Sequence, residues 1–446
     1  MTRFMIAGTH SGCGKTTVTC AILQALKNRR LDVASFKCGP DYIDPMFHSR
    51  VIGTAAYNLD GFFCGKDTLN FLLHQNGRDV SVMEGVMGFY DGVGQTASSH
   101  QLALDTETPV VLVIDCKGMS ASIGAVMKGF LTYQTPHNIA GVIFNRLPES
   151  LVTMAKEFCT EMKVTYFGRF PTAKECTVES RHLGLVTADE IHGLREKMQR
   201  LAALAEKHLL IDELLQTGKC AEISTFTPPV IPYRSTIRPK IAVARDKAFC
   251  FYYEDNLNLL REMGCEILPF SPLTDRALPD GVSGLLLGGG YPELYAKELA
   301  ANESMRSDIR AAIAAGLPTI AECGGFLYLN QSLETPDGEI YPMVGSIDGY
   351  GFRTEKLRRF GYVYLTAEDD NLLCARGEEI PAHEFHYWDS DNCGNGFTAR
   401  KASNGLTYPC VHARESLYAG FPHLYFYANP KIAEHFVRKC EAYISI

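Results

Sequence analysis

The sequence predicts an α/β protein of two domains, and three observations lead to this prediction. In the first half of the chain, short apolar runs alternate with amphipathic segments, the pattern of a parallel sheet with helices on both faces. The pattern stops at STFTPPVIPYRSTIR (224–238), which has three prolines and no helical period. It begins again at residue 240. We therefore expect domains at 1–223 and 239–446, joined by a linker at 224–238.

The individual elements follow from their apolar patterns. In the first domain, the amphipathic stretch TVTCAILQALKNRR (17–30) predicts a helix between two buried strands. The expected strands there are FMIA (4–7), VASFK (33–37), VSVME (80–84), VVLVID (110–115) and AGVIFN (140–145). In the second domain, DNLNLLREMGC (255–265) predicts a helix that ends at Gly264. The expected strands of that domain are KIAVAR (240–245), CEILPF (265–270), SGLLLGGG (283–290) and TIAECGG (319–325).

Composition narrows the classes of function. The 446 residues carry a net charge of −8, which gives no sign of a nucleic-acid or membrane surface. No apolar stretch approaches the ~20 residues that a membrane span needs. The fifteen cysteines form no C-x-x-C pair, and their odd number without a secretory leader predicts reduced thiols in the cytoplasm. The oligomeric state stays open, with a homodimer among the options.

The stretch GTHSGCGKTT (8–17) has the context of a phosphate-binding loop, because it lies between an expected strand and an expected helix. The amide groups and the dipole of a helix N-terminus favour a phosphate. Lys15 would add positive charge, and the Thr16 hydroxyl would be a ligand of Mg²⁺. Five residues separate Gly8 from Gly14, whereas the usual pattern has four. This spacing indicates a different branch of the same phosphate-binding chemistry. The residues expected to contact the nucleotide are Gly8, Thr9, Ser11, Gly12, Cys13, Gly14, Lys15, Thr16 and Thr17.

This loop resembles that of the dethiobiotin synthetases and their relatives, which activate a carboxylate with ATP. Further stretches of the first domain are similar to the cobyrinate a,c-diamide synthase family and to cobyric acid synthases. These stretches are FKCGPDYIDP (36–45), NLD (58–60), MEGVMGFYDG (83–92) and SRHLGL (180–185). The resemblance implies a dethiobiotin-synthetase-like P-loop domain with a parallel sheet.

The resemblance also implies a metal site beside the loop. Glu84 ends a buried strand, where its carboxylate would hold Mg²⁺ directly or through water. Asp115 also ends a strand, but the family match favours Glu84, so we expect Asp115 to be a strand-end cap. Of the two acids in the segment 36–45, Asp41 is preferred to Asp44 as a further metal ligand.

Two more residues of the first domain have implied roles. Lys37 would neutralise the substrate carboxylate or the transferred phosphoryl group, and Asn145 matches the adenine-reading position of the family. A polycarboxylate substrate needs local positive charge on a protein of this net charge. The candidates are Lys37, Arg146, Arg181 and EKLRRF (355–360), although we expect Lys356, Arg358 and Arg359 mainly on a solvated surface.

In the second domain, Cys323 lies on an expected sharp turn between a strand and a helix, in TIAECGGFLYL (319–329). A thiol there is exposed near a positive helix end, which favours a nucleophile. The N–H of Gly324 and a second N–H at Gly289 or Gly290 would hold an oxyanion. With ARDKAFCFYYEDNL (244–257), GGGYPELYA (288–296) and PMVG (342–345), this segment resembles the family's glutamine amidotransferase domain, which has a flavodoxin-like α/β fold.

A nucleophilic thiol needs a base, and histidines occur in PAHEFHYW (381–388) and GFPHLYF (420–426). The resemblance selects His423, because the family's active histidine lies near the C-terminus in an H-L-H-F-like segment. Many related amidotransferases carry a glutamate two residues after this histidine, but position 425 is Tyr. We therefore expect a Cys–His dyad whose histidine is held by some other group. His383 and His386 are expected to serve the fold or a substrate loop.

The resemblance covers essentially the whole chain and implies one coupled reaction. ATP would phosphorylate a carboxylate of the substrate, and Cys323 would release ammonia from glutamine. The ammonia would reach the acyl phosphate along an enclosed path. The family amidates the a and c side chains of cobyrinate, a cobalt corrinoid, in cobalamin biosynthesis. The expected activity is that of a carbon–nitrogen ligase with Mg²⁺ as cofactor and with ATP, glutamine and cobyrinate as small-molecule partners.

Two alternatives remain at this point. The same chemistry could act on nickel-sirohydrochlorin or on hydrogenobyrinate. A more remote alternative is a MinD-like switch ATPase fused to an inactive amidotransferase domain. The intact turn around Cys323 and the segment 36–45 argue against the switch.

Overall fold

The computed structural model describes residues 1–93, 97–172, 193–219, 225–357 and 359–444. The chain forms two compact units, Met1–Pro229 and Val230–Ile446. The division therefore falls inside the proline-containing segment 224–238. Both units are α/β, so the predicted fold class is confirmed.

The N-terminal unit is built on one seven-stranded sheet in the order β3-β2-β4-β1-β5-β6-β7, and all neighbouring strands are parallel. Its strands are β1 (Thr2–Gly8), β2 (Val33–Cys38), β3 (Ala55–Leu59), β4 (Val80–Glu84), β5 (Val110–Asp115), β6 (Ile139–Asn145) and β7 (Thr165–Phe170). Nearly every residue of the central strands is buried, because helices cover the sheet. The apolar runs at 4–7, 33–37, 80–84, 110–115 and 140–145 all form strands of this sheet.

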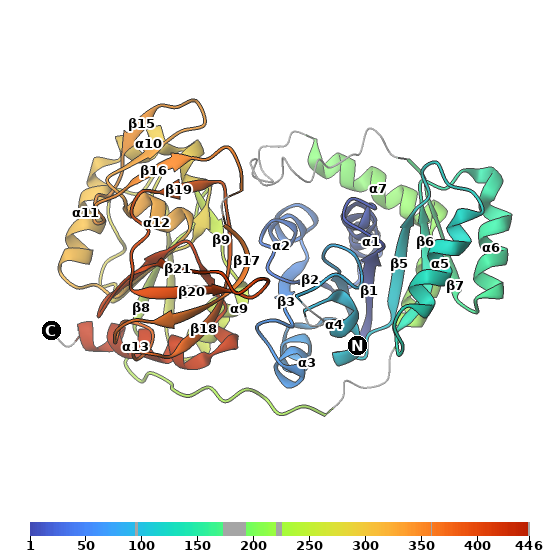
Figure 1. Ribbon diagram of the computed structural model, residues 1–446, viewed down its shortest axis with the longest axis horizontal. Helices are drawn as coiled ribbons and strands as arrows, with labels where there is room; N and C mark the ends of the chain where they lie inside the picture. The colour runs from blue at the N-terminus through green and yellow to red at the C-terminus, as the bar shows by residue number, and fades with distance from the viewer. Residues whose placement is uncertain (94–96, 173–192, 220–224, 358, 445–446) are drawn as a thin grey trace. The chain divides into compact units, whose positions relative to one another are not determined.

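Eight α-helices of the described residues accompany this sheet. They are α1 (Lys15–Asn28), α2 (Ile43–Phe47), α3 (Lys66–Asn76), α4 (Ser99–Asp105), α5 (Ser122–Thr132), α6 (Val152–Glu161), α7 (Leu194–His208) and α8 (Ile211–Gly218). Figure 1 shows α1 running beside β1, with α7 next to it. Their shared core includes Val18 and Ile22 of α1 and Met198 and Leu201 of α7. This packing holds the N-terminus of α1 at the carboxyl end of β1, where the predicted phosphate loop lies.

The C-terminal unit has a central six-stranded sheet in the order β10-β8-β11-β13-β23-β22. Its strands are β8 (Lys240–Ala244), β10 (Glu266–Phe270), β11 (Gly284–Leu287), β13 (Thr319–Glu322), β22 (His412–Arg414) and β23 (Leu417–Gly420). Only the pair β22–β23 is antiparallel. The α-helices of this unit are α9 (Glu254–Glu262), α10 (Ala296–Ala301), α11 (Glu303–Ala314), α12 (Gly324–Leu329) and α13 (Pro430–Ile444).

Further strands, mostly in antiparallel pairs, complete this unit, and the sequence analysis did not anticipate them. One sheet joins β17 (Arg359–Ala367), β18 (Glu379–His386), β20 (Phe397–Lys401), β21 (Thr407–Cys410) and β24 (His423–Leu424). Another joins β14 (Ser332–Glu334), β15 (Ile340–Pro342), β16 (Tyr350–Arg353) and β19 (Trp388–Ser390). The short strand β24 pairs with β18 and so brings the segment 420–426 against this sheet.

One expected strand is divided. The run 283–290 was predicted as a single strand, but β11 ends at Leu287, and β12 (Gly289–Gly290) pairs with β9 (Phe249–Phe251) in a separate antiparallel ladder. At Gly290 a Cβ would lie 2.1 Å from the Ala248 carbonyl oxygen, so the chain approaches β9 more closely than a side chain allows. The glycines therefore redirect the chain instead of extending the strand.

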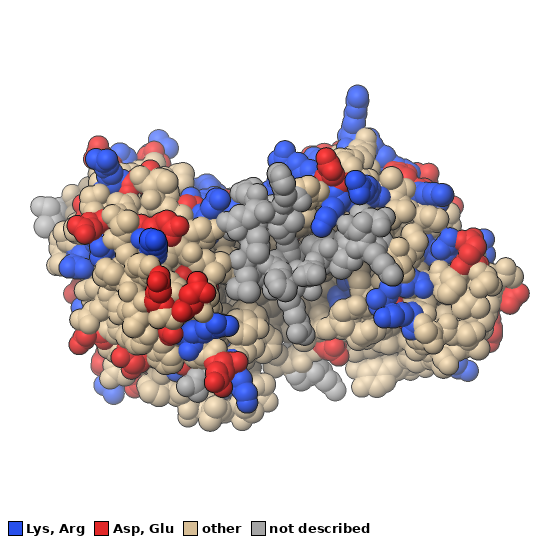
Figure 2. Space-filling view, turned by 90° about the horizontal axis from the view of Figure 1, so that it is seen from above, with Lys and Arg blue, Asp and Glu red and all other residues tan. Residues whose placement is uncertain are grey.

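On the faces seen in Figure 2, Lys and Arg side chains are interspersed with Asp and Glu on both units. Among the described residues, no helix is both long enough and apolar enough to span a bilayer.

Candidate active site

The predicted phosphate loop connects β1 to α1 through a turn that requires glycine. Gly12 and Gly14 have φ values of 81° and 98°, in the left-handed region that other residues rarely adopt. At Gly14 a Cβ would also lie 2.2 Å from the side-chain nitrogen of Asn145. The Asn145 amide donates a hydrogen bond to the Cys13 carbonyl oxygen at 2.8 Å. The structure thus places Asn145, at the end of β6, directly against the loop.

Lys15 begins α1, and its side chain folds back over the loop. Its ammonium group donates to the carbonyl oxygens of Met87 at 2.6 Å and of His10 at 3.2 Å. Burial lowers the pKa of Lys15. These carbonyl groups are neutral, whereas phosphate oxygens are charged. Phosphate oxygens would therefore bind the ammonium group more strongly and replace the carbonyl oxygens. The geometry therefore suits a lysine that binds a phosphate.

Thr16, Lys37 and Glu84 meet at the carboxyl edge of the sheet, because β4 lies between β1 and β2 and pairs Lys37 with Glu84 in register. One oxygen of Glu84 accepts hydrogen bonds from the Thr16 hydroxyl at 2.6 Å and from the Lys37 ammonium at 2.9 Å. Burial raises the pKa of Glu84 to about 7. Its other carboxylate oxygen is buried and has no hydrogen-bond partner. A cation could satisfy this oxygen.

Asp41 and Asp44, the two acids of the segment 36–45, make different contacts. Asp44 forms an ion pair with Lys37 at 2.5 Å, whereas the nearer Asp41 oxygen lies 3.9 Å from the same ammonium. Asp41 instead accepts hydrogen bonds from the backbone N–H groups of Ile43 and Asp44 at the start of α2. Burial raises the pKa of Asp41 to about 6. Burial alone would also raise the pKa of Asp44, but the charge of Lys37 outweighs it and the pKa is lowered.

The sequence analysis missed His48, which belongs to the same cluster. Its Nε2 lies 3.5 Å from the unpartnered oxygen of Glu84, and neither ring nitrogen has a hydrogen-bond partner. Burial lowers the pKa of His48 to about 4, so the ring is neutral near pH 7. One local feature points to it: His48 follows Asp44 by four residues, the spacing of one helical turn.

The oxygen donors at this edge suit Mg²⁺, which prefers hydroxyl, carboxylate and phosphate ligands. Thr16, Glu84, Asp41 and Asp44 supply such donors. The described part of the chain contains no group of three His, Cys, Asp or Glu side chains already arranged around a metal.

Asp115, the competing acid, is engaged elsewhere. It forms a two-point ion pair with Arg146, whose Nε lies 2.7 Å from one carboxylate oxygen. The same oxygen accepts the backbone N–H of Lys117 at 3.1 Å. Asp115 therefore caps the end of β5 and neutralises Arg146, so Arg146 is less available for a carboxylate ligand. Arg181, the segment 180–185 and Arg358 lie outside the described residues.

In the C-terminal unit, Cys323 forms the whole turn between β13 and α12. Its φ and ψ are 50° and −104°, a backbone conformation rarely adopted by residues other than glycine. Its N–H donates to the Gly420 carbonyl oxygen at 2.8 Å, which ties the turn to β23. A Cβ at Gly324 would lie 3.0 Å from the Gly290 nitrogen, and one at Gly325 would lie 2.0 Å from the Leu287 carbonyl oxygen. The residues after the cysteine thus pack directly on the glycine-rich segment 288–290.

His423 lies on β24 beside this turn. It is buried and lies close to the Cys323 thiol. Its Cε1 packs against Gly289, where a Cβ would lie only 2.8 Å away. Its Nδ1 lies 3.3 Å from a carboxylate oxygen of Glu322, the residue before the cysteine. Burial alone would lower the pKa of His423, but Cys323 and Glu322 outweigh it and raise the pKa to about 10.

The other two candidate histidines have different partners. His383 lies opposite His423 in the β18–β24 pair. Nδ1 of His386 is 2.6 Å from the Trp388 carbonyl oxygen, and its ring stacks on Phe421 with centroids 3.8 Å apart. Burial lowers the pKa of His383 to about 3 and that of His386 to about 4, so both rings are neutral.

Arg359 was expected on a solvated surface, but its guanidinium lies over the Tyr408 ring and 3.9 Å from the buried Glu384.

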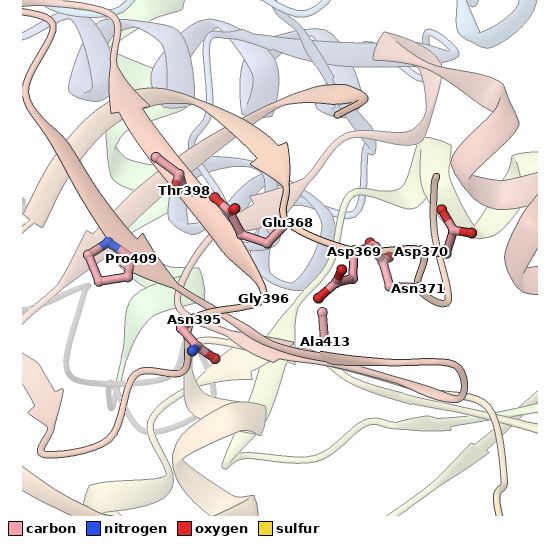
Figure 3. Close-up of a pocket in the computed structure, with 9 residues that line it drawn as sticks. All are labelled: Glu368, Asp369, Asp370, Asn371, Asn395, Gly396, Thr398, Pro409 and Ala413. Atoms are coloured by element: carbon pink, nitrogen blue, oxygen red, sulfur yellow. Dashed lines mark hydrogen bonds between the residues drawn. The ribbon is translucent and has the colours of Figure 1, made fainter. Parts of the chain in front are cut away.

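Figure 3 shows a pocket lined by nine residues, three of which are acidic, and none of the predicted site residues is among them. Its Glu368 already accepts a hydrogen bond from Thr398.

Comparison with known proteins gives the class of this protein. Residues 4–184 match the family model of the CobQ/CobB/MinD/ParA nucleotide binding domain. Residues 240–430 match that of the CobB/CobQ-like glutamine amidotransferase domain. Together with the strand orders and the two strand-to-helix turns, these matches define a glutamine amidotransferase joined to a P-loop nucleotide-binding domain.

Curated relatives narrow this class. The chain is 38% identical over 449 residues to the cobyrinate a,c-diamide synthase of Caldanaerobacter subterraneus subsp. tengcongensis, covering 99% of this chain and 98% of that protein. It is 39% identical to the enzyme of that name from Listeria monocytogenes, with 98% of each chain covered. It is 38% identical to the one from Thermoplasma volcanium, covering 99% of this chain and 98% of the relative. The chain belongs to the cobyrinate a,c-diamide synthase family.

Proposed function

We propose that the protein uses ATP and glutamine to convert the a and c side-chain carboxylates of cobyrinate into amides, a step of cobalamin biosynthesis. The observation that carries this proposal is the similarity to cobyrinate a,c-diamide synthases over at least 97% of the chain. Both units contribute to the reaction, because a carboxylate is a poor electrophile and does not condense with ammonia in water. One unit activates the acid and the other supplies the nitrogen.

In the N-terminal unit, the substrate carboxylate attacks the γ-phosphorus of ATP, and ADP leaves with the formation of an acyl phosphate. The glycine loop 8–14 offers backbone N–H groups to the phosphates, and Lys15 moves its ammonium from the carbonyls of Met87 and His10 to them. Lys37 neutralises the incoming carboxylate or the transferred phosphoryl group. Asn145 holds the loop through the Cys13 carbonyl oxygen and would read adenine, as the resemblance to the family implies.

Thr16, Glu84 and Asp41 would hold Mg²⁺, and Asp44 lies close enough to take part. When bound, this ion would spread the charge that develops on the phosphate oxygens. Before it binds, Lys37 compensates the charges of Asp44 and Glu84. Asp44 and Glu84 are thus both paired with a buried cation.

In the C-terminal unit, the Cys323 sulfur attacks the side-chain amide carbon of glutamine. His423 receives the thiol proton before the attack, forming the imidazolium that its raised pKa favours, and then gives this proton to the leaving nitrogen, so ammonia departs and a glutamyl thioester remains. Water then hydrolyses the thioester to glutamate and restores the thiol. The N–H of Gly324 and one N–H at Gly289 or Gly290 stabilise the oxyanion of the tetrahedral intermediates. Ammonia attacks the acyl phosphate and displaces phosphate, which completes the amide.

The reaction takes place in the cytoplasm under this proposal, because ATP and glutamine are abundant there. The cysteines of the described residues are all free thiols, as a nucleophilic cysteine requires.

Mass spectrometry of the products tests the proposal. Cobyrinate and nickel-sirohydrochlorin are offered in parallel with ATP, Mg²⁺ and glutamine. We expect two successive decreases of about 1 Da on cobyrinate, since each amidation replaces OH by NH₂. Amidation of nickel-sirohydrochlorin alone would leave the chemistry intact and change the substrate. No amidation of either would contradict the proposal.

A further inference from the structure

We propose that Glu322 is the positioning residue for His423, so that the nucleophile and the group that orients its base are neighbours in the sequence. The inference rests on the proposed glutaminase roles of Cys323 and His423 and goes beyond them. It supplies the third group that the expected Cys–His dyad lacked.

The contacts of the Glu322 carboxylate carry the argument. One oxygen lies 3.3 Å from Nδ1 of His423, and the other accepts the backbone N–H of Leu424 at 3.1 Å. The carboxylate therefore contacts two successive residues of β24, His423 and Leu424. With Nδ1 turned to Glu322 as a donor, Nε2 is the ring nitrogen left to accept the proton of the Cys323 thiol. A fixed tautomer of this kind is what the acid of a catalytic triad provides.

The backbone at Cys323 explains how adjacent side chains reach one imidazole. In a regular strand, successive side chains point to opposite faces of the sheet. The positive φ of 50° at Cys323 breaks that alternation just after Glu322. The position where related amidotransferases carry their glutamate is occupied by Tyr425, whose hydroxyl donates to the buried Asp255 at 3.0 Å. That side chain is committed to the core, so it does not orient His423.

The other titratable groups facing His423 come from β18, and they are either neutral or occupied. Nδ1 of His386 points at the Trp388 carbonyl oxygen, and His383 is a buried neutral ring. Glu384 accepts a hydrogen bond from the Tyr408 hydroxyl and lies near Arg359. Glu322 and Cys323 from the β13–α12 turn are then the groups that stabilise a charged imidazole.

Glu322→Gln in the full-length protein is the direct test, because glutamine keeps the shape and removes the charge. We expect kcat of the glutaminase reaction to fall about 10²-fold, with KM for glutamine within about twofold. We also expect the alkylation rate of Cys323 by iodoacetamide, followed by peptide mass spectrometry, to rise at a higher pH than in the wild type. Without the neighbouring negative charge, the imidazolium and hence the thiolate are less stable. Ammonium-dependent amidation should be unchanged.

Glu322→Asp and Glu415→Gln complete the experiment. Asp keeps the charge, so the pH profile of alkylation should return towards that of the wild type even if kcat is only partly restored. Glu415 is an exposed carboxylate paired with Lys439, and its substitution should change neither reaction. Wild-type kcat and an unshifted alkylation profile in Glu322→Gln would overturn the inference. So would loss of ammonium-dependent amidation that Glu322→Asp does not repair. Glutaminase activity in Cys323→Ala would instead overturn the proposed function itself.

Discussion

The two units place their reactive groups at the same kind of junction, where a parallel strand ends and a helix begins, but they build it in opposite ways. In the N-terminal unit, six residues separate β1 from α1, and Gly12 and Gly14 adopt the left-handed backbone. In the C-terminal unit, one residue separates β13 from α12, and Cys323 itself adopts a positive φ. The long junction offers backbone N–H groups to an anion, whereas the short one holds a single side chain, Cys323, which was expected to be exposed but is buried.

This difference separates binding from covalent chemistry. A loop that surrounds a phosphate must be wide, and glycine supplies its backbone at little cost. A nucleophile must be presented at a fixed place, and the tightly packed glycines at 324 and 325 hold that place against the segment 288–290. The comparison predicts that the two sites can be inactivated independently.

Cys323→Ala should give the largest separation. Without the sulfur, no thioester forms, so glutamine-dependent amidation should fall by at least about 10⁴-fold. Amidation with ammonium chloride should continue, because the N-terminal unit does not use the thiol. Both rates are read from product masses, and Cys265→Ala, a thiol before β10, is the matched control. Loss of both nitrogen sources would show that the two sites are not independent.

His423→Ala should reduce glutaminase activity about 10³-fold, since the thiol loses its proton acceptor. His386→Ala should cost less than about tenfold, because that ring is engaged by the Trp388 carbonyl oxygen and stacks on Phe421. Glutamate release measures both variants. If His386→Ala reduced glutaminase activity more than His423→Ala, the base would be His386 on β18 and not His423 on β24.

Lys15→Ala tests the other side of the comparison. Removing the ammonium should lower amidation about 10²- to 10³-fold with either nitrogen source, because it stabilises the transferring phosphoryl group. Basal glutamate release should persist. Lys27→Ala, in the last turn of the same helix, should leave amidation unchanged. If Lys15→Ala kept its ATP-dependent amidation, the interpretation of residues 8–17 as a phosphate-binding loop would be wrong.

The parts that the sequence predicted are those in which neighbouring residues determine the structure. The apolar runs of the parallel strands are buried on both faces, so the pattern survives in the sequence and the fold class could be predicted. The antiparallel strand β17 was not anticipated, because Phe360 is exposed and aromatic residues alternate on it with buried Val363 and Leu365. Such a half-exposed aromatic strand lacks the continuous apolar run that marked the others.

The same contrast applies to the sites. Lys15 directly follows a glycine-rich turn and Cys323 forms a turn before two glycines, so both junctions could be located from the sequence. The contact of Glu322 with His423 joins residues 101 positions apart, and that of His48 with Glu84 joins different elements. Nothing local to any of these residues indicates its partner. The choice between Asp41 and Asp44 likewise depends on the position of Lys37 in space, which the spacing of the acids leaves open.

The smallest predicted effect compares two glycines of the wide loop. Both have positive φ, so an alanine at either position costs about 1–2 kcal/mol of backbone strain. At Gly12 the added methyl group meets nothing within 4 Å, whereas at Gly14 it collides with the Asn145 amide. Gly14→Ala should therefore weaken ATP binding more than Gly12→Ala, by a further factor of about ten, as measured by calorimetry. Glutaminase activity should be the same in both. Equal losses would mean that backbone strain, and not the contact with Asn145, sets the affinity of the wide junction for its nucleotide.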